Sequence, residues 1–145
     1  MYTVLQHLHS GLAYLVLLAL LISAVVFLIK RGSASSFSAG DKRLALIALI
    51  LTHLQLVIGL VLYFIGPKGY AFFEADNVMQ NETMRLYAVE HISVNIIGII
   101  LVTIGYSRAK RSTKVRKKFG SLGWFYLIGL VLILSRIPWE AWLGV

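Results

Sequence analysis

The sequence predicts an all-α membrane protein, an antiparallel bundle of four transmembrane helices in a single domain over residues 1–145, with both termini outside. Three observations predict this class. The chain is strongly apolar, since 59% of its residues are hydrophobic and its mean hydropathy is +0.82. Four segments reach or approach the roughly 20 apolar residues that a helix needs to cross a bilayer. The connections between them are short, which favours antiparallel neighbours.

The four expected spans carry almost no charged residues. They cover residues 2–29, 44–67, 86–107 and 119–139. The first two contain no Asp, Glu, Lys or Arg, the third contains Glu90, and the fourth contains Arg136 near its end. The first span lacks the positively charged start of a cleaved signal peptide, and its apolar run is too long for one, so we expect a retained helix. Long Leu, Ile and Val runs are typical of lipid-facing helices rather than of the strands of a membrane barrel.

The segments between the spans contain residues that are typical of helix ends. Residues 32–40 form a connector rich in Ser, Gly and Ala, and Asp41 after it is a suitable N-cap for the second helix. Gly66 and Pro67 end that helix. The longest loop covers 69–83. The aromatic residues expected at the outer membrane interface are Tyr70, Phe72, Phe73, Trp139 and Trp142.

The net charge of +8 is distributed unevenly along the chain. Basic residues gather in the first and third loops, whereas the second loop is acidic. By the positive-inside rule the first and third loops are cytoplasmic, and the second loop and both termini are outside. The basic loops would also attract anionic lipid headgroups. No motif or aromatic context of a nucleic-acid-binding protein accompanies them, so we expect the lipid bilayer and not nucleic acid as the partner.

The composition excludes several kinds of site. The chain has no cysteine, so it forms no disulfide, thiolate metal site or iron–sulfur cluster. Zinc is not expected, because there is no compact His and carboxylate pattern such as H-E-x-x-H. Hydrolytic catalysis has little support, because no Ser, His and Asp set is arranged by helical spacing. The histidines therefore carry the functional hypothesis.

Two stripes of small and polar residues run along the second and third spans at spacings of three and four. They are Thr52, Gln55, Gly59, Tyr63 and Gly66 in the second span, and His91, Asn95, Gly98, Val102 and Gly105 in the third. Such stripes favour close packing of helices in lipid. They also leave room for a flat cofactor, so the sequence is compatible with packing alone and with a binding site.

Three of the four histidines, His9, His53 and His91, lie in three different spans. An ionisable side chain in the bilayer core is costly, and neutral imidazole is a common ligand of metals and of haem iron. With a rise of about 1.5 Å per residue, His9 and His91 both lie roughly 9–10 Å below the outer ends of their helices. Their helices are diagonal in an up-down bundle, so the two rings can face each other as the axial ligands of a b-type haem do.

The other two histidines fit this arrangement less well. His53 lies roughly 20 Å from the outer end of its helix, so it is the alternative ligand, or a residue of a second site or a proton path. His7 is two residues from His9 and points to the opposite side of the helix, where it can reach water. The structural alternative for each histidine is a hydrogen bond to a neighbouring helix, for which Asn95 and Gln55 are available partners.

Glu90 and Arg136 are charges expected at the same outer depth. Buried charges need partners, so the two residues predict an ion pair that joins the third and fourth helices. The functional alternative is that Arg136 binds a propionate of the haem, or that Glu90 relays protons. Both interpretations are open from the sequence.

Three segments carry a resemblance to known proteins: HLHSGL at 7–12, THLQLVIGLVLYF at 52–64 and AVEHISVNIIGIILVTIGYS at 88–107. Over most of its length the chain resembles small bacterial four-span membrane proteins labelled cytochrome b, including the basic third loop and the IPW at 137–139. It is distantly similar to one four-helix half of the haem A synthases, which have two such halves. The resemblance implies a haem-carrying bundle in the bacterial inner membrane, with the histidines of the three spans as candidate ligands.

These observations predict a protein that binds one haem b near the outer leaflet through His9 and His91, with His53 as the alternative iron ligand and Arg136 as a further cofactor-binding residue. The expected role is one-electron transfer, with a quinone or a membrane redox complex as the partner. The alternative is a cofactor-free structural or accessory subunit of a membrane complex. A small transporter or channel has less support, because four spans without paired repeats offer little for alternating access. Oligomerisation is open.

Overall fold

The computed structural model describes residues 1–33 and 36–143, and its regular elements over that part are all helical. The four long helices are α1 (Tyr2–Gly32), α2 (Ala39–Ile65), α4 (His91–Arg111) and α5 (Val115–Ser135). The short helical elements are η1 (Tyr70–Glu74), α3 (Glu82–Arg85), η2 (Leu86–Glu90) and α6 (Trp139–Leu143). Each long helix belongs to a segment long and apolar enough to cross a membrane. This confirms the all-α class with four candidate spans.

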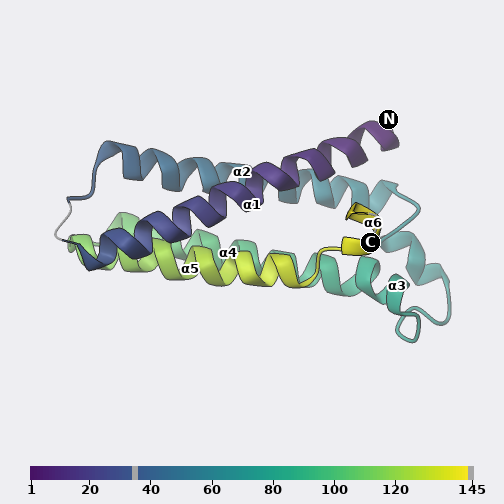
Figure 1. Cartoon of the computed structure of the whole chain (residues 1–145). Helices are drawn as coiled ribbons and strands as arrows, with labels where there is room; N and C mark the ends of the chain where they lie inside the picture. The colour runs from purple at the N-terminus through teal and green to yellow at the C-terminus, as the bar shows by residue number, and fades with distance from the viewer. Residues whose placement is uncertain (34–35, 144–145) are drawn as a thin grey trace.

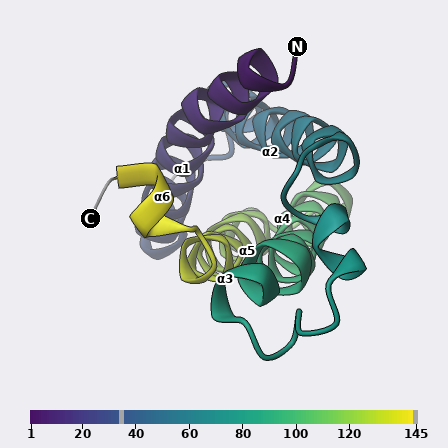
Figure 2. The same cartoon turned by 90° about the vertical axis from the view of Figure 1, so that its right-hand side faces the viewer.

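The four long helices lie side by side along one axis (Figure 1). Consecutive helices run in opposite directions, so the start of α1 and the end of α5 lie at the same end of the bundle. Seen end-on, the helices follow one another around a ring in the order α1, α2, α4 and α5 (Figure 2). α4 packs most extensively against α5, and α5 against α1, whereas α2 and α4 share a smaller contact. α1 and α4 are therefore diagonal, as expected.

The largest fully buried side chains lie toward the end of the bundle where the first loop joins α1 to α2. Phe27, Phe119 and Tyr126 are fully buried there, and the Phe27 and Phe119 rings stack with centroids 6.2 Å apart. The buried Tyr126 hydroxyl donates a 2.9 Å hydrogen bond to the Ala45 carbonyl, which satisfies it in an apolar setting. Large apolar side chains cover much of the outer surface of the long helices, as expected for helices surrounded by lipid.

α4 and α5 approach each other closely through glycines. A Cβ at Gly129 would lie 2.9 Å from the Gly98 carbonyl oxygen. A Cβ at Gly105 would lie 2.5 Å from Phe125 Cβ and 3.0 Å from the Ser121 carbonyl oxygen. A larger residue does not fit at these positions unless the helices move apart. Along this part of its length, the small-residue stripe of the third span therefore serves packing.

The prediction that Asp41 is the N-cap of the second helix is wrong. The cap is Ser38, whose side chain accepts a 3.2 Å hydrogen bond from the Asp41 N–H. Asp41 is the fourth residue of this capping box, and its carboxylate accepts from the Ser38 N–H at 2.9 Å. The carboxylate also pairs with Lys30 of α1 at 2.6 Å, so it links two helices at the basic end of the bundle. Because the cap lies earlier in the chain, α2 begins at Ala39.

The fourth span also differs from the expected range of 119–139. α5 begins at Val115 and ends at Ser135, before Pro138. Proline lacks the N–H that continues a helix, and it disfavours helical backbone at the residue before it. The chain after Pro138 forms the separate helix α6, whose Trp142 lies against Tyr14 of α1 with ring centroids 4.4 Å apart. α6 is thereby folded back over the end of the bundle that contains the candidate site.

Candidate cofactor site

A cavity of about 310 Å³ lies between the helices at the end of the bundle where α1 begins and where α6 lies. This volume is near the lower end of the roughly 300–1,000 Å³ that is usual for ligand sites. Residues of α1, α2, η2 and α4 form most of the wall, and the chain after α5 closes one side. The wall is mainly apolar. Its polar side chains include Gln6, His9, Ser10, Gln55, Tyr63, Lys68, Tyr87, His91 and Asn95.

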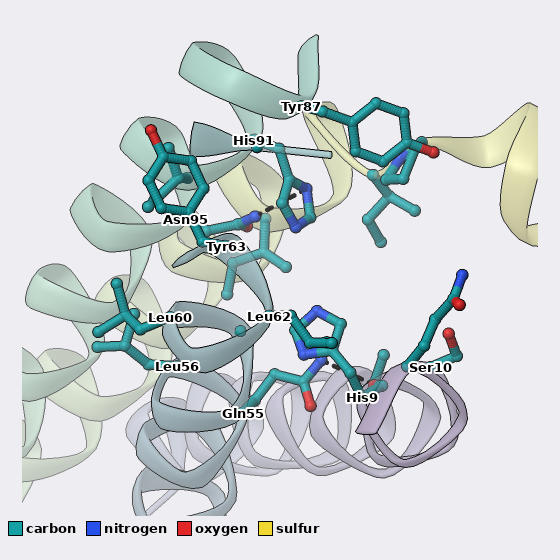
Figure 3. Close-up of a pocket in the computed structure, with 18 of the residues that line it drawn as sticks. His9, Ser10, Gln55, Leu56, Leu60, Leu62, Tyr63, Tyr87, His91 and Asn95 are labelled. Atoms are coloured by element: carbon teal, nitrogen blue, oxygen red, sulfur yellow. Dashed lines mark hydrogen bonds between the residues drawn. The ribbon is translucent and has the colours of Figure 1, made fainter. Parts of the chain in front are cut away.

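His9 of α1 and His91 of α4 face each other across this cavity (Figure 3). Their ring centroids are 6.4 Å apart, and the ring planes are inclined by 71°. At this separation the nearest ring nitrogens remain about 4 Å apart or more, which is too far for a hydrogen bond between the rings. These are the two predicted ligands that the structure brings together.

The His91 ring is held by the chain after α5. Its Nδ1 lies 2.7 Å from the carbonyl oxygen of Arg136. A carbonyl only accepts hydrogen bonds, so Nδ1 carries the hydrogen and Nε2 keeps its lone pair. Asn95 lies one turn further along α4, with its Nδ2 3.1 Å from the same Nδ1. A half-turn of the Asn95 amide would let its oxygen share the Nδ1 hydrogen.

A π-helical turn precedes His91 directly. The His91 N–H donates to the Leu86 carbonyl, five residues back, whereas an α-helix would use a carbonyl four residues back. The Tyr63 hydroxyl of α2 donates a 2.9 Å hydrogen bond to the Ala88 carbonyl within this turn. The extra residue rotates the chain before His91 relative to α4, and the Tyr63 bond ties the turn to α2. Single π turns of this kind occur often at functional sites.

α2 positions His9. A Cβ at Gly59 would lie 2.9 Å from Cε1 of His9, so the imidazole occupies space that any other residue at position 59 would take. One turn earlier on α2, the Gln55 side chain donates from Nε2 to the His9 carbonyl oxygen at 2.9 Å. The backbone and the ring of His9 are thus both set by contacts with α2.

Three buried polar atoms around the cavity have no hydrogen-bond partner within the described chain. They are His9 Nδ1, Gln55 Oε1 and the Asn95 amide atom that faces away from His91, which is Oδ1 before the half-turn described above and Nδ2 after it. Buried polar groups are nearly always hydrogen-bonded, and leaving one unpaired costs about 1–3 kcal/mol. All three atoms belong to residues that line the cavity. The cavity therefore suits a ligand that forms hydrogen bonds or contains a metal. An empty space left by imperfect apolar packing would not be lined by unpaired polar atoms.

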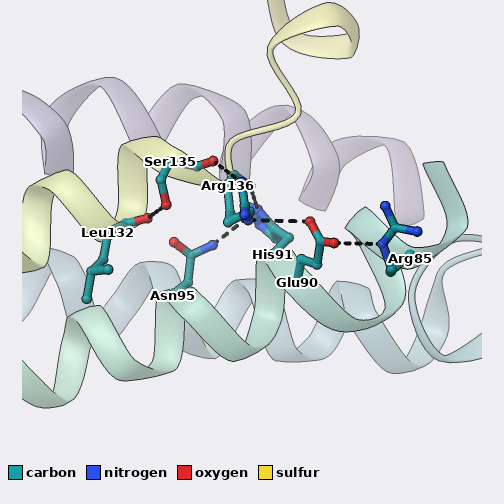
Figure 4. Close-up of polar contacts among 7 residues, drawn as sticks. All are labelled: Arg85, Glu90, His91, Asn95, Leu132, Ser135 and Arg136. Atoms are coloured by element: carbon teal, nitrogen blue, oxygen red, sulfur yellow. Dashed lines mark hydrogen bonds and ion pairs between the residues drawn. The ribbon is translucent and has the colours of Figure 1, made fainter. Parts of the chain in front are cut away.

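Glu90 forms ion pairs with two arginines beside the cavity (Figure 4). Its Oε1 lies 2.8 Å from Arg85 Nε, and its Oε2 lies 3.4 Å from Arg136 Nε. The expected pair of Glu90 and Arg136 is therefore present, and Arg85 shares it. The Arg136 guanidinium turns toward Glu90, and Arg136 is not one of the residues that line the cavity in the described chain. A contact of Arg136 with a propionate stays a prediction.

The remaining histidines lie outside the cavity. His53 Nδ1 lies 2.8 Å from the Leu49 carbonyl oxygen, and its Nε2 lies 3.3 Å from the Thr103 hydroxyl, so both ring nitrogens have protein neighbours. His7 is exposed. Over residues 1–33 and 36–143, no group of three or more His, Asp and Glu side chains gathers to hold a metal ion.

Lys68 is a residue of this cavity that sequence reasoning missed. It is exposed, it lines the cavity, and its ammonium group lies 4.7 Å from the centroid of the Tyr87 ring. The sequence could have indicated its role, because Lys68 directly follows Gly66 and Pro67, which end the second span. A cation at that point lies at the open end of any site between the helices. From the sequence alone, Lys68 contributes only to the charge balance of the second loop.

The fold and the cavity define a class of protein: an all-helical chain with four membrane-compatible helices and two facing imidazoles in a cavity at one end. Comparison with protein-family models, with curated proteins and with solved structures finds no match.

Proposed function

We propose that the cavity binds one b-type haem with His9 and His91 as its axial ligands, and that the protein transfers single electrons in the membrane. The observation that carries this proposal is the 6.4 Å between the two ring centroids. An imidazole nitrogen lies about 2 Å from a metal that it binds and about 1.1 Å from the centre of its own ring, so two axial imidazoles have centroids roughly 6.3 Å apart. His9 and His91 already have this separation.

The hydrogen-bonding state of the rings supports the same proposal. The Arg136 carbonyl selects the His91 tautomer that leaves Nε2 free to bind a metal, and such outer partners are usual for metal-bound histidines. If His9 binds through Nε2, its Nδ1–H needs an acceptor. Gln55 Oε1 is buried and unpaired in the described chain, and Gln55 already contacts the His9 backbone. Gln55 is therefore the candidate second partner for this ring.

Lys68 is the candidate partner for the carboxylates of the haem. Its side chain is exposed at the end of the cavity, and no carboxylate of the described chain forms an ion pair with it. Arg136 differs, because Glu90 already pairs with it. We infer that Arg136 acts on the site chiefly through its carbonyl oxygen, and that Lys68 supplies the positive charge.

A haem with two axial imidazoles supplies reversible one-electron transfer and offers no open position to a substrate. The chain contributes the two ligands, the carbonyl that orients His91, and an apolar wall that excludes water, which together tune the potential of such a group. A quinone or a membrane redox complex is the proposed partner. This function agrees with the resemblance to the small four-span proteins labelled cytochrome b and to one half of the haem A synthases.

We propose the bacterial inner membrane as the location, with the first and third loops in the cytoplasm and both termini outside. The support is the positive-inside rule. The Lys and Arg residues gather in and beside the first and third loops, and the exceptions are Lys68, Arg85 and Arg136, which lie at the cavity end. The haem site then lies near the outer leaflet, since the cavity is at the end opposite to the basic loops.

An optical spectrum tests the proposed function. Protein purified from cells supplied with haem should show a Soret band and a sharp reduced-minus-oxidised band, with about one haem per chain. Colourless protein after such expression would contradict the proposal. If that colourless protein also co-purified in fixed ratio with another membrane protein, the structural-subunit alternative would be favoured.

Gly59→Ala should weaken haem binding in a folded bundle. The added methyl group would lie 2.9 Å from His9 Cε1 and would push the ring off its position, so we expect an affinity loss of about 10-fold or more, as for other changes that misorient a metal ligand. Haem titration of the purified apoprotein measures the affinity. Gly11→Ala is the matched control, because a Cβ at Gly11 meets no atom within 4 Å. An unchanged affinity for Gly59→Ala would argue against His9 as a ligand.

A further inference from the structure

A second hollow, at the opposite end of the bundle from the haem cavity, is surrounded by positive charge. It is open to the surface, has a volume of about 770 Å³, and lies where the end of α1 meets the connection between α4 and α5. Its cationic residues are Arg31, Arg108, Arg111, Lys114, Arg116 and Lys117. The Arg31 side chain of α1 packs against α5 here, because a Cβ at Gly120 of α5 would lie 3.0 Å from Arg31 Nε.

The cations of this hollow have no carboxylate partner in the described chain, unlike other basic residues of the protein. Lys30 pairs with Asp41, and Arg85 and Arg136 both pair with Glu90. Between Glu90 and Glu140 the sequence contains no acidic residue at all. Six positive charges therefore share one hollow without an internal counter-ion, and their mutual repulsion favours binding of an anion from outside.

The hollow also has aromatic residues in its lining. Trp124 and Phe125 of α5 line it, and the Arg108 guanidinium lies 5.6 Å from the centroid of the Phe125 ring. Trp124 is 47% exposed, and it stands two turns into α5, between the charged first turn and the apolar remainder of the helix. Tryptophan is enriched at this depth because its ring suits the boundary between headgroups and acyl chains. A ligand that fits both features has an anionic head and an apolar tail.

We propose that this hollow is a binding site for an anionic phospholipid. The phosphate lies among the guanidinium groups of Arg31, Arg108 and Arg116, where planar donor groups match phosphate oxygens. The acyl chain runs along Trp124 toward the lipid-facing side of α5. Because the cations outnumber the charge of one phosphate, a lipid with two phosphates binds more tightly than a lipid with one. This site is independent of the haem proposal, since it lies at the other end of the bundle.

Native mass spectrometry of the delipidated, detergent-solubilised protein tests this inference. We expect phosphatidylglycerol to bind at least about 10-fold more tightly than phosphatidylcholine, and the preference to weaken as salt is raised. The double variant Arg108→Gln/Arg116→Gln should lose about 30-fold in affinity for phosphatidylglycerol, because each basic residue near an anionic lipid contributes roughly 5-fold. The control Lys42→Gln/Arg43→Gln removes the same charge at the same end, from residues that do not line the hollow, and should retain most of the affinity.

Two further measurements separate a lipid site from a general attraction of anions. Trp124→Ala should weaken phosphatidylglycerol binding, and inorganic phosphate should fail to displace the lipid at millimolar concentration. Equal losses in the two charge-matched double variants would overturn the proposal, because they would show a diffuse surface effect. Displacement of the lipid by millimolar phosphate, or equal affinity for phosphatidylglycerol and phosphatidylcholine, would overturn it as well.

Discussion

Replacing His91 with Ala should abolish haem binding by the purified protein while the bundle stays folded. His91 is one of two rings that face each other across the cavity at 6.4 Å, and under the proposed ligation the haem iron would lose a ligand if either ring were removed. His9→Ala should have the same effect. We expect the haem content of both variants to fall at least about 10-fold, the loss usual for damage to a metal site. Pyridine haemochrome assays measure the content, and far-UV circular dichroism reports the fold.

His53→Ala and His7→Ala are the matched controls for this prediction. His53 has protein neighbours at both ring nitrogens and lies outside the cavity, and His7 is exposed, so both variants should keep their haem. His91→Met adds a sharper test, because Met is a known axial ligand that raises the reduction potential. Retention of haem by His91→Met with a raised potential would identify position 91 as a ligand. Full haem content in His91→Ala would refute the assignment.

Gly105→Leu should strongly destabilise the bundle. A Cβ at this position would lie 2.5 Å from Phe125 Cβ and 3.0 Å from the Ser121 carbonyl oxygen. Neither neighbour is the movable end of a side chain, so α4 and α5 must separate. We expect a loss of about 3 kcal/mol in unfolding free energy, the upper end of the range for overpacking. Denaturant titration in mixed micelles measures it.

Gly11→Leu is the control for the packing prediction. Gly11 lies on an exposed face of α1, and a Cβ there meets no atom within 4 Å. We expect no loss of stability and a gain of up to about 1 kcal/mol, because leucine has the higher helix propensity. Similar losses in both variants would mean that the close approach of α4 and α5 does not limit what fits at position 105.

The four spans could be predicted because length and composition decide what can cross a bilayer. The ends of the helices were less predictable, since they depend on local contacts. Ser38, rather than Asp41, caps α2 because its side chain reaches the Asp41 N–H, and the two residues are equally plausible caps by type. Pro138 ends α5 earlier than expected, and the chain after it forms the separate helix α6. From the sequence, the aromatic residues of α6 are assigned to the outer end of the fourth span.

The pairing of His9 and His91 could be predicted from depth, because helical rise is regular and their helices are diagonal. The details of the site could not. The sequence places Gly59 in a stripe of small residues that favours helix packing. Only the structure shows that the absence of a side chain at this position makes room for the His9 ring. Lys68 reads as loop charge, because its place beside Tyr87 depends on how the chain turns after α2. Arg136 was selected for its guanidinium, yet its carbonyl is the group that contacts His91.

The π turn at Leu86–Glu90 sets a fixed rotation between the chain before it and α4 after it. The segment before it is out of phase with α4 by one residue, which is about 100° around the helix axis. A change in the length of the preceding loop need not turn the His91 imidazole, provided that the turn itself is kept. Deletion of a single residue within 86–90 would instead restore regular winding and bring the two parts into a common phase. The loop before the turn and His91 after it are thus free to vary separately, whereas the number of residues in the turn must stay the same.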